Sequence, residues 1–451
     1  MRARTVVGAL AGLAVITIAV QGCAAGKGAL VGADGKIDGA GQTLNVLVGV
    51  DTVYPQQQKE WQAQMAAQFA KTTGATLKYD TYASPADELT RIQTSVISGQ
   101  GPDVYSIGTT FTPTAYSLGA FVKLTAADWK AVGGRDRFQP ASLGISGPST
   151  KNEIGVPAAS RPFVLAYNKD LLAKAGISAP ATTWDDLAAQ AKTMTGGGTY
   201  GIATDYADTA DPWKFAWAMG AQAGNPLVSG DKATLDTESM VSAYRAYFGW
   251  LTKDKVVDPA SVGWNSAQAL ANFASGKSAY LLMTTAASKP TLDKSPVAGK
   301  YGYALMPTVP PGHTERPAGG QDVASILSGD NLVVANYSKN QALAFAYIKQ
   351  ATAQKQQENF YKTFGQLPTN KAAVTALESA DPTLKPIEAA AGKSAATPFT
   401  GAWSDIQLAL VNINVQSIPA LKNGSITTAE IRKQLVTAQQ AAQQALAQQQ
   451  K

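Results

Sequence analysis

The chain has 451 residues, of which 45% are hydrophobic and 16% are charged, and this composition excludes an intrinsically disordered protein. A chain of this length exceeds one ordinary hydrophobic core, so two domains or two lobes are expected. The 38 basic and 32 acidic residues give a net charge of +6 but form no dense basic run, which argues against a nucleic-acid-binding face.

The N-terminus has the features of a secretion signal. Arg2 and Arg4 precede an apolar stretch at 6–20, which has the length of a signal-peptide core and is too short to span a membrane comfortably. The stretch leads into VQGC (20–23), which resembles the lipobox of bacterial lipoproteins. Cys23 is the only cysteine of the chain, so it cannot form an internal disulfide.

From this segment we expect a signal peptide at 1–22 and a lipid anchor on Cys23. Residues 23–42 are rich in Gly and Ala and are expected to be a flexible tether. A lipid-modified cysteine would hold the protein at the outer face of the cytoplasmic membrane. The remainder of the chain contains no apolar run as long as a membrane helix requires, which is about 20 residues.

Catalytic and metal-binding motifs are scarce. His313 is the only histidine and lies in a Pro- and Gly-rich stretch, which argues against a Ser-His-Asp or Cys-His system and against histidine-rich metal sites. The sequence contains no P-loop and no G-x-G-x-x-G motif after a strand. We therefore expect no catalytic residues, no metal and no cofactor.

Three short apolar segments near the N-terminus are predicted to be parallel strands. Between them, apolar residues at helical spacing predict two helices. The first helix is expected to end at Gly74, and the second to begin at the N-cap Ser84, which is followed by Pro85. This order is typical of an α/β fold. The strands are 43–50, 75–82 and 103–107, and the helices carry Trp61, Met65 and Phe69, then Leu89, Ile92 and Val96.

In the rest of the chain, short predicted strands continue to alternate with predicted helices. The helix expected from 339 to 358 is the longest before the C-terminal pair. Further strands are predicted at 153–157, 163–167, 200–204, 301–305 and 331–334, and further helices from 183 to 194 and at 239–251, 266–274, 401–423 and 427 to the end.

Five sequence blocks, in this order, resemble the extracellular solute-binding proteins of ABC importers, in the family of maltose- and other sugar-binding proteins. Each block alone is weakly specific, but their order and spacing together make the match specific. The resemblance covers about residues 43–440. The blocks are FAKTTG (69–74); GPDV (101–104) with GAFVKLT (119–125); IGVP (154–157) with AYNKDLL (166–172), AG (175–176) and TWD (183–185); FASGKSA (273–279); and ALAFAYI (342–348) with GQLP (365–368).

The resemblance implies a two-lobed α/β periplasmic-binding-protein fold of type II, whose lobes close on a ligand like a hinged clamp. The crossings between the lobes would be 157–162, 307–320 and 365–370, each of which contains Pro or Gly. One lobe would comprise 43–158 and 308–366, and the other 159–307 and 367–451.

Candidate ligand-binding residues follow the carboxyl ends of the predicted strands, where open α/β sheets bind ligands. Sugar rings stack on aromatic side chains, and their hydroxyls need polar partners. These residues are Asp51, Tyr54, Thr109, Thr110, Arg161, Trp213, Trp217, Trp264, Asn265, Thr285, Gly320, Gln321, Asp322 and Trp403; the same loops also offer Phe111, Ser160, Asp205, Tyr206 and Gly319.

Alternatives remain open for several of these residues. Trp213, Trp217 and Trp264 fit the core as well as a ligand site, and Asp51 and Arg161 fit ordinary surface pairing as well. The resemblance implies that Trp403 stacks on the ligand, because members of the family stack sugars on the residue at that position. Trp61 and Trp184 are expected to pack in the core.

The resemblance implies a sugar-binding lipoprotein that delivers a carbohydrate, expected to be an oligosaccharide, to a membrane permease without altering it. A monomer with no nucleic-acid partner is expected. The alternative is the same fold binding a polyamine, an anion or ferric iron, and a secreted glycosidase using paired carboxylates is a further rival. Where the family often has Gly-x-Trp, this chain has MTTA (283–286), so no particular sugar is implied.

Overall fold

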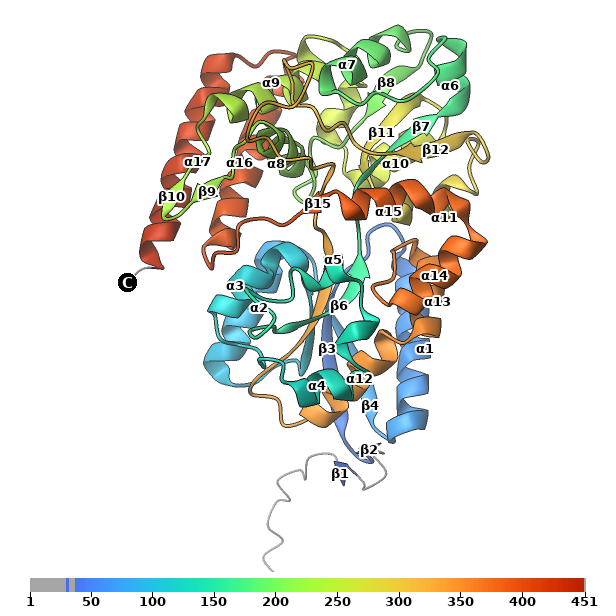
Figure 1. Cartoon of the computed structure of the whole chain (residues 1–451), viewed down its shortest axis with the longest axis vertical. Helices are drawn as coiled ribbons and strands as arrows, with labels where there is room; N and C mark the ends of the chain where they lie inside the picture. Colours follow the sequence, from blue (N-terminus) through green and yellow to red (C-terminus); the bar gives the residue numbers. More distant parts are fainter. Residues whose placement is uncertain (1–29, 32–36, 450–451) are drawn as a thin grey trace, which may run out of the picture.

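The computed structural model describes residues 30–31 and 37–449. It forms two lobes, one above the other in Figure 1, each built around its own β-sheet, which confirms the predicted two-lobed α/β fold. The predicted signal peptide at 1–22 and the lipid site Cys23 lie outside the described residues. Within those residues, no helix combines the length and the hydrophobicity needed to cross a membrane.

The lower lobe in Figure 1, called the first lobe, contains a five-stranded sheet. β3 is parallel to β4 and β5, whereas β14 enters from the C-terminal half of the chain and is antiparallel to β5 and β6. Its strand order is β4 (Thr76–Tyr82), β3 (Thr43–Gly49), β5 (Val104–Gly108), β14 (Gly329–Val334) and β6 (Gly155–Ser160).

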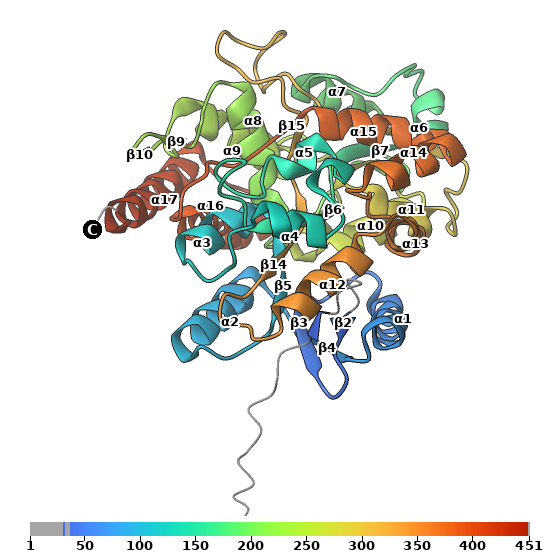
Figure 2. The same ribbon diagram turned by 60° about the horizontal axis from the view of Figure 1, so that its bottom comes forward.

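Both faces of this sheet are buried, because apolar side chains alternate along its strands. Val46 packs with Met65 and Phe69 of α1 (Pro55–Thr73), whereas Leu47 packs with Ile92 of α2 (Pro85–Ser98). Figure 2 shows α1 and α2 on opposite sides of β3 and β4. Around the same sheet lie α3 (Thr112–Ser117), α4 (Ala126–Ala131), α5 (Pro140–Leu143) and α12 (Gln341–Ala351).

The predicted ends of these helices are confirmed. Gly74 terminates α1 in the left-handed conformation with a φ of 72°, and the Ser84 side chain accepts from the Asp87 N–H at the start of α2. The predicted apolar stripe of α2 is wrong at one position, because Val96 is 37% exposed and the inward face carries Glu88, Ile92 and Ser95 instead.

The single helix expected at 339–358 is also wrong, because the chain breaks between α12 and α13 (Gln354–Phe364). The carbonyl group of Thr352 does not continue a helix but accepts hydrogen bonds from Asn370 Nδ2, at 3.0 Å, and from Arg137. These partners lie far away in the sequence, so the break is set by tertiary contacts. It lets α13 run beside α1 (Figure 1).

The second lobe contains a four-stranded sheet in the order β12 (Tyr301–Ala304), β7 (Val164–Asn168), β11 (Ser278–Thr284) and β8 (Tyr200–Ala203). Val164 and Ala166 face one hydrophobic cluster and Leu165 faces another, so both faces of this sheet are also covered. The helices on its two faces are α6 (Lys169–Lys174), α7 (Trp184–Thr193), α8 (Pro212–Gln222), α9 (Glu238–Thr252), α10 (Ser266–Ala274), α11 (Lys289–Leu292), α14 (Lys371–Ala380) and α15 (Lys385–Gly392).

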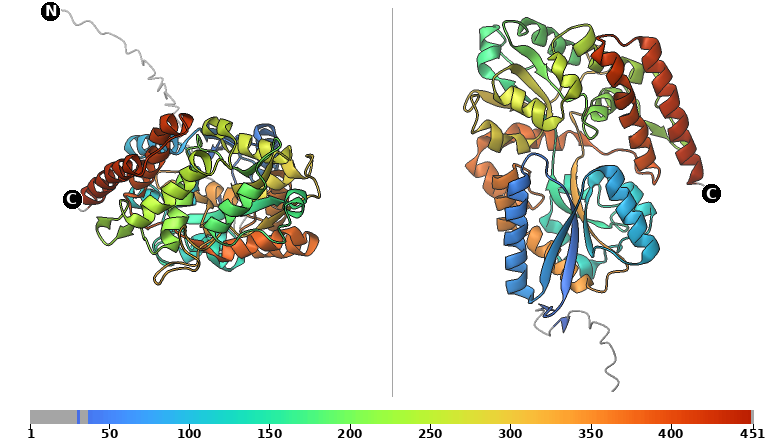
Figure 3. Two further views of the ribbon diagram at one scale, coloured as in Figure 1. Left: turned by 90° about the horizontal axis from the view of Figure 1, so that it is seen from above. Right: turned by 180° about the vertical axis from the view of Figure 1, so that it is seen from behind.

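Two long C-terminal helices, α16 (Trp403–Lys422) and α17 (Thr428–Gln448), form a hairpin on the flank of the second lobe. Figure 3 shows them side by side in both views. α17 begins with a capping box at Thr427, in which the side chains of Thr427 and Glu430 bond each other's backbone N–H groups.

The segments that connect the lobes lie side by side. Ser160 and Leu367 exchange two backbone hydrogen bonds of 3.0 and 3.1 Å, and Arg161 N donates to Ser328 O at 2.8 Å. The stretch between β12 and β14 also contacts the second lobe, because Gln222 Nε2 donates to Pro307 O and Val323 O. The numerical boundaries of the lobes stay predictions.

Candidate functional site

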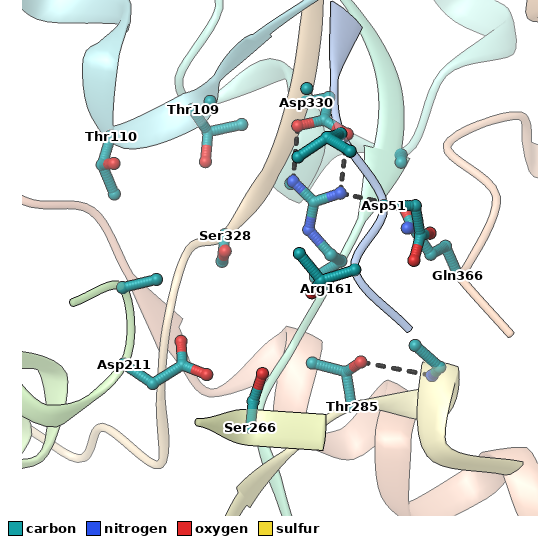
Figure 4. Close-up of a pocket in the computed structure, with 18 of the residues that line it drawn as sticks. Asp51, Thr109, Thr110, Arg161, Asp211, Ser266, Thr285, Ser328, Asp330 and Gln366 are labelled. Atoms are coloured by element: carbon teal, nitrogen blue, oxygen red, sulfur yellow. Dashed lines mark hydrogen bonds and ion pairs between the residues drawn. The ribbon is translucent and has the colours of Figure 1, made fainter. Parts of the chain in front are cut away.

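A cavity of about 890 Å³ lies between the two lobes. Its wall includes the loop after β3, the end of β5, the first lobe crossing, the loop after β8, the end of β11 and one face of α16. Figure 4 shows Thr109 and Thr110 on one side of this space and Asp211, Ser266 and Thr285 on the other. The volume lies in the upper part of the range for small-molecule sites, about 300–1,000 Å³.

The loop after β3 is held in place by Asp51. Its Oδ1 accepts from the N–H groups of Val53 and Tyr54 at 2.9 and 2.7 Å, and its own N–H donates to Gln58 Oε1 at 3.0 Å. These bonds fix the turn that starts α1 and present both Asp51 and Tyr54 to the cavity.

Tyr54 also connects the two lobes. Its hydroxyl group donates to Ala287 O at 2.5 Å and lies 3.0 Å from Thr291 Oγ1, both in the second lobe. Burial raises the pKa of Tyr54, so the hydroxyl remains a neutral donor. Thr285 caps the same region of the second lobe by accepting from Ala287 N at 3.2 Å, and it lines the cavity (Figure 4).

Arg161 lies at the point where the three crossings meet. Its guanidinium group binds both carboxylate oxygens of Asp330 and donates to Gln366 Oε1 at 2.9 Å (Figure 4). Burial disfavours its charge, but Asp330 outweighs this effect, so the pKa of Arg161 is raised above its usual value. Arg161 and Gln366 lie in two of the connecting segments and Asp330 lies at the start of β14, so the ion pair ties the lobe junction to the first-lobe sheet at the wall of the cavity.

A second set of charges lies where β8 leads into α8. The carboxylates of Asp205, Asp208 and Asp211 lie within 4.8 Å of one another, and Lys214 Nζ is 2.8 Å from Asp211 Oδ1. Burial raises the pKa of Asp205 and of Asp211, and neighbouring carboxylates add to both rises. Lys214 already supplies a positive charge to this cluster, and Asp205, Asp211 and Lys214 line the cavity.

The structure places most of the predicted tryptophans in the hydrophobic core. Trp403 is 0% exposed, and its ring packs against Trp213 with centroids 5.9 Å apart. Trp213 borders the cavity but is only 1% exposed, whereas Trp217, Trp264 and Trp403 do not line it. Trp213 and Trp217 are buried because α8 is enclosed on nearly all sides within the second lobe, whereas Trp264 is partly buried.

Four further predicted residues lie away from the cavity lining. Asn265 is the N-cap of α10, where it accepts from Gln268 N at 3.1 Å. Gly320, Gln321 and Asp322 belong to a loop that packs on the second lobe, where Gln321 N donates to Ala221 O at 3.0 Å. Asp322 pairs with Lys393 and Arg316 on the surface, and the Lys393 ammonium group in particular lowers the pKa of that carboxyl.

Residues 64–387 of the chain match the family described as bacterial extracellular solute-binding protein. The chain belongs to this family. The predicted resemblance is thereby confirmed. Because a solute-binding protein captures its solute without transforming it, the chain is not an enzyme, and the family is extracellular, which places the protein outside the cytoplasm.

The similarity to individual proteins extends over almost the whole chain. The chain is 28% identical to the diacetylchitobiose binding protein DasA of Streptomyces coelicolor over 411 residues, covering 88% of this chain and 89% of the relative. A maltose-bound MalE3 of T. maritima has a similar structure, with a TM-score of 0.73 and 20% identity, over 88% of this chain and 99% of that one. The GacH receptor of Streptomyces glaucescens gives a TM-score of 0.71 at 21% identity, over 90% and 98%.

Sequence reasoning about this solute-binding protein missed several residues of the cavity wall. Trp61, expected in the core, is only partly buried and lines the cavity with Phe360 and Phe364 of α13, and the Trp61–Phe360 ring centroids are 5.2 Å apart. Asp330 and Gln366 were missed because the strand-end rule selects carboxyl ends of strands, whereas Asp330 lies at the start of β14, which is antiparallel to β5, and Gln366 follows α13. The strand-end rule could have found Asp211, which follows β8 within the loop before α8.

Proposed function

We propose that this solute-binding protein is the receptor of an ABC importer and that it binds a neutral carbohydrate, an oligosaccharide, in the cavity between its lobes. Ligand contacts made by both lobes would stabilise the closed protein, which then delivers the sugar to a membrane permease. The observation that carries the proposal is a large inter-lobe cavity whose two basic side chains among the described residues, Arg161 and Lys214, are already paired with carboxylates.

The charge pairing favours a neutral ligand over the alternatives. A polyamine would need ionised carboxylates, but burial raises the pKa of the two buried lining carboxyls that pair with no cation of the described chain, Glu88 and Asp205. An anion would need a free cation. In this cavity Arg161 is bound to Asp330 and Lys214 is bound to Asp211. The carboxylate of Asp51 accepts from backbone N–H groups. Hydroxyl groups of a sugar can bind such groups without disturbing their charges.

The size of the cavity and the nature of the relatives support an oligosaccharide. A volume of about 890 Å³ lies near the upper end of the range for small-molecule sites, which suits a ligand of more than one sugar ring. The Streptomyces coelicolor relative is named for diacetylchitobiose, and solved neighbours are described with maltose, acarbose and cycloalternan, although two others are described with the smaller ribitol and tagatose. The side chains of Trp61 and Phe360 contribute apolar surface to the cavity wall, against which the C–H face of a sugar can pack.

A thermal-shift screen tests the ligand class. Diacetylchitobiose, maltose and acarbose are compared with spermidine, phosphate and ferric citrate, because a ligand that binds only the folded state raises Tm. At least one sugar is expected to raise Tm, while the three charged compounds leave it unchanged. The proposal is overturned by a rise with spermidine, phosphate or iron and none with the sugars.

Two substitutions, one at a residue that lines the cavity and one at a residue outside its lining, test the placement of the site. Thr110 lines the cavity, and Thr110→Val replaces its hydroxyl group with a methyl group of similar size, so we expect the affinity for the best sugar of the screen to fall about two- to tenfold. Gln321 is exposed on a loop outside the cavity lining, and Gln321→Ala should leave the affinity unchanged. Calorimetry showing the reverse pattern would place the site elsewhere.

We further infer a lipid anchor on Cys23 after removal of residues 1–22, with a tether at 23–42 and a monomeric body. The lipobox-like VQGC (20–23) supports this inference. Metabolic labelling with a fatty-acid analogue should label the parent protein and fail with Cys23→Ser, which should also be released from the membrane fraction. Equal labelling of both proteins would contradict the anchor.

A further inference from the structure

A buried carboxyl group that forms no ion pair with a described residue lines the cavity. Glu88 lies in the first turns of α2 on the face that points into the first lobe, together with Ile92 and Ser95. It is 4% exposed, and it borders the inter-lobe cavity. A residue at this helical position would ordinarily be apolar, because the same face packs against β5.

The carboxyl group of Glu88 has an unused oxygen. Its Oε1 is buried and has no hydrogen-bond partner among the described residues. A buried polar atom without a partner costs folding free energy, which a purely structural residue would avoid by being apolar or paired. Because Glu88 borders the cavity, a ligand hydroxyl group is a partner that the described residues do not supply to this oxygen.

No cation is free to pair with Glu88 in the described part of the chain. The charged and titratable groups around it are Tyr82 at the end of β4, Arg161 in the first crossing, Asp330 on β14, and Asp87 and Arg91 on α2 itself. Arg161 is bound to Asp330. Arg91 is bound to Asp80 and Asp87 on the exposed side of the helix.

We propose that Glu88 is a ligand-contact residue that binds a hydroxyl or carbonyl oxygen of a neutral sugar. This inference rests on the proposed function and adds a residue that determines specificity within the same cavity. An acidic sugar would meet no free cation on this wall, and the contact therefore favours uncharged ligands.

The charge state of Glu88 agrees with this role. Burial raises the pKa of Glu88 to about 8, and the nearby Asp330 carboxylate adds to the rise, whereas the Tyr82 hydroxyl and the Gly108 N–H oppose it. At neutral pH the side chain is mainly the uncharged acid, which can both donate and accept a hydrogen bond. Above pH 8 it loses the proton with which it would donate to the sugar.

The affinity of the protein as a function of pH tests the inference. Calorimetry from pH 6.5 to 9.5 uses diacetylchitobiose, or maltose if that sugar gives the larger Tm shift. The parent protein should lose affinity by about tenfold per pH unit above pH 8, because binding must then restore the proton. Glu88→Gln cannot ionise but keeps a donor and an acceptor, so its affinity should stay within about threefold of the parent at pH 7 and stay flat.

Two further variants complete the test. Glu88→Leu removes both hydrogen-bonding atoms and should weaken binding about tenfold at pH 7. Glu60→Gln, on the exposed face of α1 outside the cavity lining, is the control and should behave as the parent protein does. If both Glu88 variants bind the sugar with the affinity and the pH dependence of the parent protein, the role of Glu88 is overturned but the proposed function is not. Failure of every sugar to bind the parent protein would overturn the proposed function, and the role of Glu88 with it.

Thermal unfolding without ligand separates a folding effect from a binding effect. A carboxyl whose pKa is raised in the folded state costs nothing below its unfolded pKa, and its cost grows as the pH rises toward 8. Glu88→Gln should therefore raise Tm by several degrees at pH 8 and leave it nearly unchanged at pH 4.5. A lower Tm for Glu88→Gln at pH 8 would show that the ionised side chain supports the fold, which contradicts the inference.

Discussion

At the scale of single residues, the surroundings of an indole ring decide whether it can meet a ligand. Trp403 packs against Trp213 and lies in the same cluster as Ile406 and Leu410, with no exposed surface. Trp61 instead lies at the open end of its cluster, beside Phe360, and borders the cavity. The two residues are chemically equivalent, so only their packing separates a core role from a contact role.

Trp403→Ala should therefore act mainly on stability. Removing a fully buried indole ring leaves a cavity in the second lobe, and we expect the free energy of unfolding to fall by about 3–5 kcal/mol. Urea denaturation followed by circular dichroism measures this change. Trp264→Ala is the control, because that ring is only partly buried and should cost less. A stable Trp403→Ala protein with lost sugar affinity would instead assign Trp403 to the ligand.

Among the helices, the end of α13 is one of the places where the two lobes approach each other closely. Gly365 terminates α13 in the left-handed conformation with a φ of 68°, and its N–H donates to Tyr361 O at 2.6 Å. A Cβ atom at this position would lie 2.1 Å from Ala286 O, in a short 3₁₀ helix of the second lobe (Ala286–Ser288). The glycine is thus required by its backbone conformation and by the close approach of another chain segment.

Gly365→Ala should consequently destabilise the protein more than the same substitution at a comparable helix end. Gly99→Ala is the matched control, because Gly99 ends α2 with a φ of 62° and a Cβ atom added there would meet no described atom within 4 Å. The control should cost about 1–2 kcal/mol from the left-handed backbone alone. Gly365→Ala should exceed that loss in the same urea titration. Equal losses would mean that the segment around Ala286 moves away without cost.

At the scale of the whole molecule, hydrogen bonds bridge the lobes on two sides of the cavity. Tyr54 bonds to Ala287 and Thr291 on one side. Thr114 of α3 bonds to Gly401 O at 3.0 Å and to Ser404 on the other. Contacts of this kind bias the equilibrium between closed and open arrangements of the lobes, and ligand affinity depends on that equilibrium.

Thr114→Val should shift this equilibrium without touching the ligand, because Thr114 does not line the cavity. We expect a larger radius of gyration for the ligand-free protein in small-angle X-ray scattering and a two- to tenfold loss of sugar affinity. Tyr54→Phe, which removes the bridge on the opposite side, should act in the same direction. An unchanged scattering curve for both variants would show that these bonds do not hold the lobes together.

Signals local in the chain were sufficient to predict several helix ends and the fold class. Ser84 and Gly74 mark helix ends through their own backbone and side-chain chemistry, and apolar segments separated by helical patterns specify an α/β lobe. These signals depend on residues close together in the chain. The order of the sequence blocks then indicated the family, which the match over residues 64–387 confirms.

Only the tertiary structure decided which residues line the cavity. Arg161 reaches the site with Asp330 and Gln366, which lie 169 and 205 positions away in the chain, and the break before α13 depends on Arg137 and Asn370. Glu88 is buried at a helix position where the sequence shows an ordinary polar residue. Burial and pairing arise from contacts between distant segments, so local chemistry specifies what a side chain can do, and packing decides whether a ligand can reach it.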